Sequence, residues 1–163
     1  MSLKELTVIK QAIINEIEGY EFYKLAAQQT QADEPKKAFE ILAEEELMHV
    51  EWLKKIYSSL NSNTEDNLLL TFEVEVPTQK IFSWANVDRK SVSLAVSVFG
   101  IAIQMERESI KFYNSASQDT DDKNLKEFYN MLSLWEQKHL EQFADEYEKL
   151  KEEWWDKQGF EPM

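Results

Sequence analysis

Apolar residues recur at spacings of three and four along most of this chain, which is the pattern of helices that bury one face. The pattern predicts one helix over residues 4–30 and a second that Asp33 caps and that ends near residue 60. In the second half, Asp88 is placed to cap a third helix, and a fourth extends to about residue 155. With three glycines and three prolines in 163 residues, little interrupts these helices. We therefore predict an all-α four-helix bundle made of two helical hairpins, residues 4–60 and 88–155.

Residues 61–87 separate the two hairpins and lack the helical pattern. Within them, residues 72–76 alternate between apolar and acidic side chains, as in a short extended segment. About 25 extended residues can span roughly 80 Å, more than the length of such a bundle. We expect this segment to form a long crossover between the second and third helices, and residues 156–163 to form a C-terminal tail. The whole chain, 1–163, is then a single domain that can bury a substantial core.

Six polar residues occupy positions of the apolar stripes that leucine or isoleucine would otherwise fill: Glu16, Glu46, His49, Glu106, Glu136 and His139. Both histidines of the chain follow a glutamate by three residues, and the two copies of this motif lie 90 residues apart (136 − 46 = 90). Residues three apart share one helix face, so the glutamate and histidine of each motif can reach the same point. Glu16 and Glu106 repeat at the same offset, and each is as far from its hairpin turn as the glutamate of the motif. The six side chains are therefore expected to converge near the middle of the bundle.

Four carboxylates that meet in a core are unstable unless protons or cations neutralise them. No lysine or arginine lies on the four stripes to act as a counter-ion. Two divalent metal ions would supply four positive charges against the four carboxylates. Carboxylate and imidazole ligands suit iron or manganese better than copper, and zinc is a further alternative. The competing interpretation is a structural bundle whose polar core binds no metal.

Tyr23 and Tyr113 lie seven residues after Glu16 and Glu106, two turns along the same helix face. Each hydroxyl is placed to bond a carboxylate on a neighbouring helix and to orient it as a ligand. An ordinary core tyrosine would give the same pattern, so both interpretations stay open. Other residues near the motifs are interpreted as solvent-facing charges (Glu18, Glu44, Glu45 and Glu108) or as packing residues (Met48, Met105 and Trp135).

The chain carries 31 acidic and 18 basic residues, a formal net charge of −13. Such a chain repels phosphate backbones, so nucleic acid is not expected as a partner. It has no cysteine, which excludes disulfides, iron–sulfur clusters, thiolate zinc sites and a rubredoxin-type iron centre. No signal peptide is visible, and the longest apolar stretch, residues 94–103, is about half of a membrane span. We therefore expect a soluble, cytoplasmic protein that does not bind a membrane.

The segments around the motifs resemble the rubrerythrin branch of the ferritin-like superfamily over nearly the whole chain; they are residues 16–23, 42–49, 106–113 and 135–139. The resemblance implies a ferritin-like four-helix bundle with two iron ions at a carboxylate-bridged site. It implies that Glu46 and Glu136 bridge the metals. Glu16 and His49 would complete the coordination shell of one metal, and Glu106 and His139 that of the other. In this family, peroxide or dioxygen oxidises the ferrous pair. The family usually forms dimers or larger assemblies, so a homodimer is expected.

Two features depart from full rubrerythrins. The cysteine-ligated rubredoxin domain that feeds electrons to the metal pair is absent, so turnover requires an external electron donor. Ser109 stands where rubrerythrins have an extra glutamate one turn after the third-helix ligand, which leaves a six-ligand set closer to that of bacterioferritins. The resulting expectation is a di-iron oxidoreductase of the peroxidase or ferroxidase type. The alternative is a non-catalytic bundle that handles iron or senses a metal.

Overall fold

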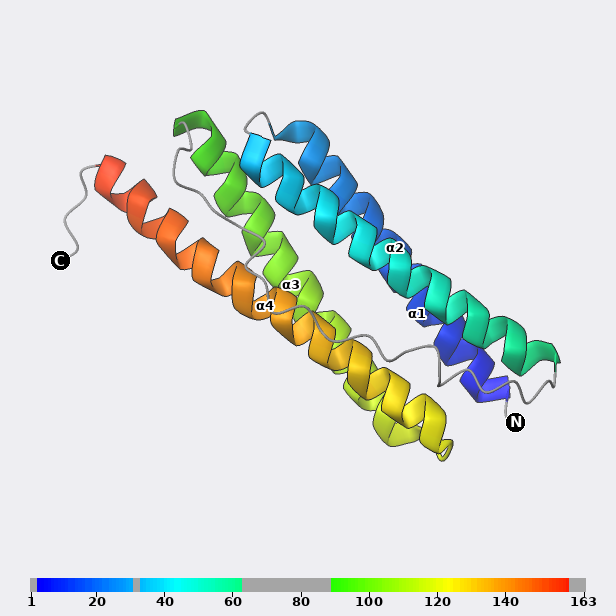
Figure 1. The fold of residues 1–163 in the computed structure, drawn as a ribbon. Helices are drawn as coiled ribbons and strands as arrows, with labels where there is room; N and C mark the ends of the chain where they lie inside the picture. The colour runs from blue at the N-terminus through cyan, green and yellow to red at the C-terminus, as the bar shows by residue number, and fades with distance from the viewer. Residues whose placement is uncertain (1–2, 31–32, 63–88, 159–163) are drawn as a thin grey trace.

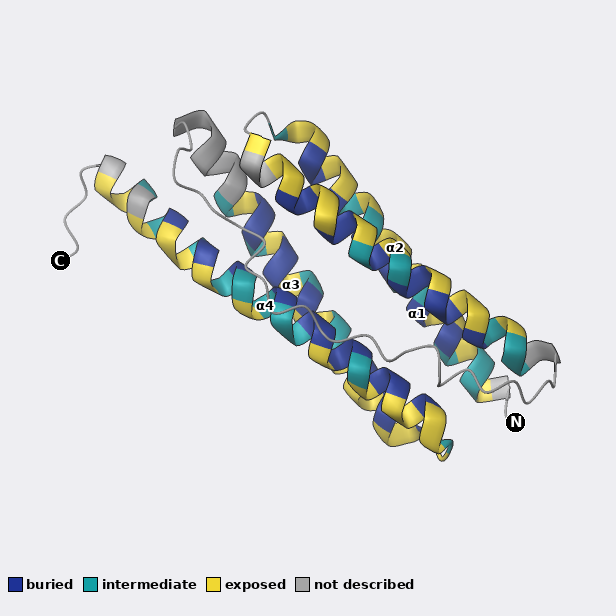
Figure 2. Ribbon diagram, viewed as in Figure 1, coloured by how far each residue is buried: buried dark blue, intermediate teal, exposed yellow. Residues whose placement is uncertain are grey.

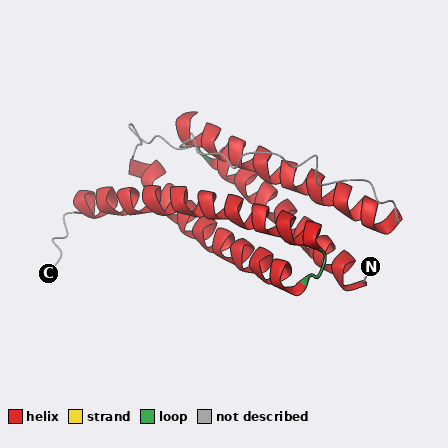
Figure 3. Cartoon of the chain, turned by 60° about the horizontal axis from the view of Figure 1, so that its bottom comes forward, coloured by secondary structure: helices red, strands yellow, loops and turns green. Residues whose placement is uncertain are grey.

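The computed structural model describes residues 3–30, 33–62 and 89–158, which form four long helices (Figure 1). The helices are α1 (Leu3–Gln29), α2 (Asp33–Ser62), α3 (Arg89–Asp119) and α4 (Lys123–Gln158). Within the described ranges there is no strand (Figure 3). The predicted all-α four-helix bundle is therefore confirmed. None of the described helices contains a stretch that is long and apolar enough to cross a membrane.

The helix ends lie within a few residues of those that the sequence predicts. Two helices are longer than expected, because α2 continues to Ser62 and α4 to Gln158. The first residues of the predicted crossover and of the predicted tail are therefore helical. The rest of the crossover, including the extended segment at 72–76, and residues 159–163 lie outside the described part of the chain.

Each half of the chain forms an antiparallel hairpin. α1 packs along α2 and α3 packs along α4, whereas α1 and α3 touch over a short stretch (Figures 1 and 3). The turn of the second hairpin starts α4 with a side-chain cap. Oδ1 of Asp122 accepts hydrogen bonds from the backbone N–H groups of Asn124 and Leu125, at 2.8 and 3.0 Å. Such a cap satisfies backbone donors that the first turn of a helix leaves without partners.

The buried apolar side chains form two clusters, one on each side of the polar residues along the helices. One cluster contains Leu42 and Phe99, and the other contains Leu53, Phe128 and Leu132. The internal repeat relates the two, because Leu42 and Leu132 hold equivalent positions in the two hairpins. Figure 2 shows that buried residues follow the facing sides of the helices while exposed residues cover the outside. The apolar stripes predicted from the sequence thus hold the hairpins together on both sides of the polar residues.

Replacing a buried leucine of this core should destabilise the protein strongly. Leu132 is fully buried, so Leu132→Ala should lower the free energy of unfolding by about 2–5 kcal/mol through lost burial and a cavity. Leu134→Ala is a matched control on the same helix, because Leu134 is 60% exposed, and it should change that free energy by less than about 0.5 kcal/mol. Denaturant unfolding of the metal-free proteins measures both values. Equal losses would mean that the inward face of α4 is assigned wrongly.

Candidate metal centre

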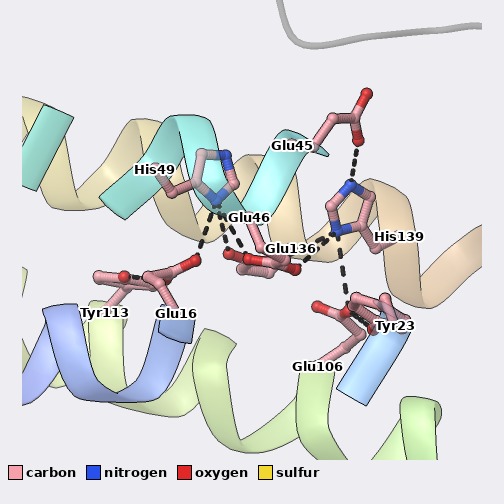
Figure 4. Close-up of polar contacts among 9 residues, drawn as sticks. All are labelled: Glu16, Tyr23, Glu45, Glu46, His49, Glu106, Tyr113, Glu136 and His139. Atoms are coloured by element: carbon pink, nitrogen blue, oxygen red, sulfur yellow. Dashed lines mark hydrogen bonds and ion pairs between the residues drawn. The ribbon is translucent and has the colours of Figure 1, made fainter. Parts of the chain in front are cut away.

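The structure brings all six predicted polar side chains together in the middle of the bundle (Figure 4). Each of them is at most 4% exposed. They form two groups of four in which one ligand atom from each residue lies within 4.8 Å of the others: Glu16, Glu46, His49 and Glu136, and Glu46, Glu106, Glu136 and His139. Glu46 and Glu136 belong to both groups. The arrangement therefore offers two adjacent metal positions with two shared carboxylates.

Both histidines present Nδ1 to the carboxylates. Nδ1 of His49 lies 3.1 Å from Oε2 of Glu16 and 3.5 Å from an oxygen of Glu46 and of Glu136. Nδ1 of His139 lies 3.3, 3.7 and 3.9 Å from oxygens of Glu136, Glu106 and Glu46. The three-residue spacing of each motif places its imidazole beside the shared glutamate of its own helix, as helical geometry requires.

Two tyrosines connect the hairpins at this level. The hydroxyl of Tyr23, on α1, donates a hydrogen bond to Glu106 on α3. The hydroxyl of Tyr113, on α3, donates to Glu16 on α1. Each tyrosine thus holds the unshared glutamate of the other hairpin, as Figure 4 shows. These bonds limit the rotamers of Glu16 and Glu106, which favours the ligand-orienting interpretation over that of ordinary core tyrosines.

Several polar atoms at the centre have no hydrogen-bond partner although they are buried. They include both carboxylate oxygens of Glu136, Nδ1 of His139 and Nε2 of His49. Glu136 still lies within ion-pair distance of the two imidazoles, at 3.3 and 3.5 Å. Buried groups of this kind destabilise a fold unless something else satisfies them. A divalent cation among these atoms would do so, and oxygen with imidazole nitrogen is a suitable donor set for iron, manganese or zinc. The residues therefore fit a pair of metal ions.

Protons take the place of cations when no metal is bound. Burial, together with the charge of Glu136, raises the pKa of Glu106 to about 8. Burial and the same neighbour also raise the pKa of Glu46. Burial disfavours the charged form of His49 and His139, but the surrounding carboxylates outweigh it and raise the pKa of both imidazoles. Burial likewise acts against ionisation of Glu136, yet its contacts with the two histidines are stronger and lower its pKa. A bound metal must displace the protons that the other groups hold.

A pocket of about 200 Å³ reaches the centre between α1 and α3. Its lining includes Gly19 and Ser109, which hold equivalent positions in the two hairpins, and the acidic residues Glu18 and Glu108. Gly19 packs directly against a shared glutamate, since a Cβ atom at this position would lie 3.3 Å from Cδ of Glu46. The pocket gives small molecules or ions a route from the surface to the carboxylates.

One residue near the centre differs from its sequence interpretation, and a second has a contact that the sequence did not predict. Glu45 was expected to face solvent, but Oε2 of Glu45 lies 2.8 Å from Nε2 of His139 and its side chain is 16% exposed. Trp135, expected as a packing residue, does pack in the core, and its ring also contacts His49 with centroids 5.2 Å apart. Both residues lie one position before a shared glutamate, which is the signal in the sequence that could have identified them.

Adding a methyl group at Gly19 should disturb the centre without harming the helix. Gly19→Ala requires Glu46 to shift by a few tenths of an ångström, so we expect the affinity for divalent metal to fall by about tenfold. Gly100→Ala is the matched control, because the nearest atom to its new Cβ is Cε2 of Tyr147 at 3.8 Å. That variant should be stabilised by about 1 kcal/mol with unchanged metal affinity. Metal titration in competition with a chelating dye measures both, and an unchanged affinity in Gly19→Ala would contradict the close contact.

The metal-free protein should lose stability as the pH rises from 6.5 to about 8. A group whose pKa is raised by folding stabilises the fold fully below its unfolded pKa and loses this effect as the pH passes its folded pKa. Glu46, Glu106, His49 and His139 all act in this direction, whereas Glu136 stays ionised over the whole interval. Each extra proton held by the folded state corresponds to about 1.4 kcal/mol per pH unit. Measuring the free energy of unfolding of chelator-treated protein at several pH values tests this prediction. Glu106→Gln should make that free energy depend less steeply on pH. A free energy of unfolding that rises with pH over this interval would contradict the prediction.

Comparison with known proteins places the chain in a family. A rubrerythrin family model matches residues 7–147, which include all six clustered residues. A hypothetical protein from Pyrococcus furiosus has a similar solved structure, with a TM-score of 0.67 and 26% sequence identity over 93% of this chain and 92% of that chain. None of the curated proteins matches. On the extent of the family match and the agreement of the fold, the chain belongs to the rubrerythrin family.

Proposed function

We propose that this protein binds two iron ions in its core and acts as an oxidoreductase toward peroxide or dioxygen. Glu46 and Glu136 would bridge the two ions. Glu16 with His49 would complete one position, and Glu106 with His139 the other. The observation that carries the proposal is the pair of four-residue groups that share Glu46 and Glu136, with buried atoms that lack partners. When bound, the iron pair would supply two electrons to the oxidant.

The surrounding residues support this chemistry by position. Tyr23 and Tyr113 hold Glu106 and Glu16 in place, so the ligand atoms need little rearrangement when a metal binds. The apolar clusters on both sides shield the carboxylates from bulk water. The pocket of about 200 Å³ between α1 and α3 is large enough for peroxide or dioxygen and small for an organic substrate.

Electrons for repeated turnover must come from elsewhere. These 163 residues contain no cysteine, so they form no rubredoxin-type centre. We propose an external electron donor as the partner. Ser109 lines the pocket in the place of the additional family glutamate, which favours a second candidate function in which iron is oxidised once and then handed on. The expected homodimer and cytoplasmic location stay predictions.

Anaerobic loading with ferrous iron followed by peroxide tests the proposal. The protein should bind two ferrous ions per chain, consume peroxide and develop near-ultraviolet absorption from ferric iron, because both positions can donate electrons. Glu136→Ala removes a shared carboxylate and should lose at least one ion and most of the reaction. Glu141→Gln changes an exposed carboxylate on the same helix and should behave like the unmodified protein.

The outcomes separate the candidate functions. Failure to bind iron would reject the metal centre altogether. Binding of two ions without accelerated oxidation would reject the oxidoreductase and leave iron handling or sensing. A single round of oxidation that does not resume after a one-electron donor such as reduced rubredoxin is supplied would favour the second candidate.

A further inference from the structure

The two metal positions have the same ligands but different surroundings. Glu45 directly precedes Glu46, and Trp135 directly precedes Glu136, so the two residues are equivalent in the internal repeat. On one side of the centre the repeat therefore places a carboxylate, and on the other side an indole ring. Each of these residues contacts the histidine of the opposite hairpin.

Glu45 sets the orientation and tautomer of His139. Its Oε2 lies 2.8 Å from Nε2 of His139, on the side of the ring away from the other carboxylates (Figure 4). A carboxylate can only accept a hydrogen bond, so Nε2 donates and carries the proton. Nδ1, which is buried without a hydrogen-bond partner, is then the nitrogen that gives up its proton and binds a metal. His139 is thus arranged as a ligand before any metal arrives.

His49 lacks this arrangement. Its Nε2 is buried and has no hydrogen-bond partner. The ring of Trp135 stands at 90° to the imidazole with centroids 5.2 Å apart, and the ring of Trp52 lies 5.5 Å away. An indole N–H cannot accept a hydrogen bond. If Nδ1 of His49 releases its proton and binds a metal, the remaining N–H is on Nε2, where it faces aromatic rings instead of an acceptor. Metal binding at this position therefore leaves a buried donor unsatisfied.

We propose that Glu45 makes the two metal positions unequal, so that the position formed by Glu106 and His139 binds a divalent metal more tightly and fills first. The position formed by Glu16 and His49 fills second and is the one that exchanges metal. This inference rests on the proposed metal-binding function and adds an order to it. Glu45 is a positioning residue, because it acts through His139 and does not itself belong to either group of clustered ligand atoms.

Two variants isolate the positions for measurement. His49→Ala leaves the His139 position, and His139→Ala leaves the His49 position. Cobalt(II) is the probe, since it is stable in air and its visible absorption reports coordination, and a competing chelator sets the affinity scale. We expect the His49→Ala protein to bind cobalt at least tenfold more tightly than the His139→Ala protein.

Removing the carboxylate gives the decisive comparison. Glu45→Leu should weaken cobalt binding by about 10–100-fold in the His49→Ala background, where it should also change the cobalt spectrum, and should leave binding unchanged in the His139→Ala background. Glu45→Gln keeps an acceptor without the charge and should give an intermediate loss. Glu44→Leu, at an exposed neighbouring position, should change neither background.

The failures are distinguishable. If the unmodified protein binds no cobalt and no iron, the proposed function itself falls. If it binds two ions of equal affinity, or if Glu45→Leu weakens both positions alike, only the order of filling is overturned. Circular dichroism of each metal-free variant checks the fold. If a histidine variant does not fold, the chain with both histidines is titrated with cobalt, with and without Glu45→Leu. The proposal then requires that Glu45→Leu weakens only the tighter of the two binding steps.

Discussion

Four carboxylates buried side by side are the constraint on which this molecule depends. Glu16, Glu46, Glu106 and Glu136 are all at most 4% exposed, and their like charges repel one another in a medium that screens poorly. Only protons or cations can relieve that repulsion. The raised pKa values of Glu46, Glu106 and both histidines show that bound protons relieve the repulsion in the metal-free protein. Divalent metal ions would relieve it in place of the protons, and their binding would then stabilise the folded state.

The apolar parts of the bundle keep this polar layer in place. One cluster of leucine and aromatic side chains packs on each side of it, and each cluster joins residues from both hairpins. Across the layer, Tyr23 and Tyr113 tie each hairpin to a glutamate of the other. Packing therefore brings the charged groups together, and the charged groups in turn make occupation by cations favourable. Membership of the rubrerythrin family agrees with this division between an apolar scaffold and a buried centre of carboxylates and histidines.

The internal repeat explains both the symmetry of the ligands and its limits. The repeat gives each of the two four-residue groups one unshared glutamate and one histidine. The surroundings differ, because the repeat aligns Glu45 with Trp135 and Gly19 with Ser109. Gly19 admits the side chain of Glu46 at close range, and Glu45 holds His139 while Trp135 packs on His49. Under the proposed function, such residues would give chemically similar positions different affinities without touching a metal.

The sequence alone determined the four helices, their pairing into hairpins and the six central residues. Helical periodicity is a local property, so spacings of three and four show which side chains share a face, and the offset of 90 aligns the two halves. By the same helical spacing, Glu45 lies beside the face that carries Glu46 and His49. On a single helix it cannot be distinguished from a solvent-facing charge. Its contact with His139 depends on how α2 is rotated against α4. That rotation, like the pocket between α1 and α3, results from the packing of many side chains from different helices, and only the tertiary structure decided it.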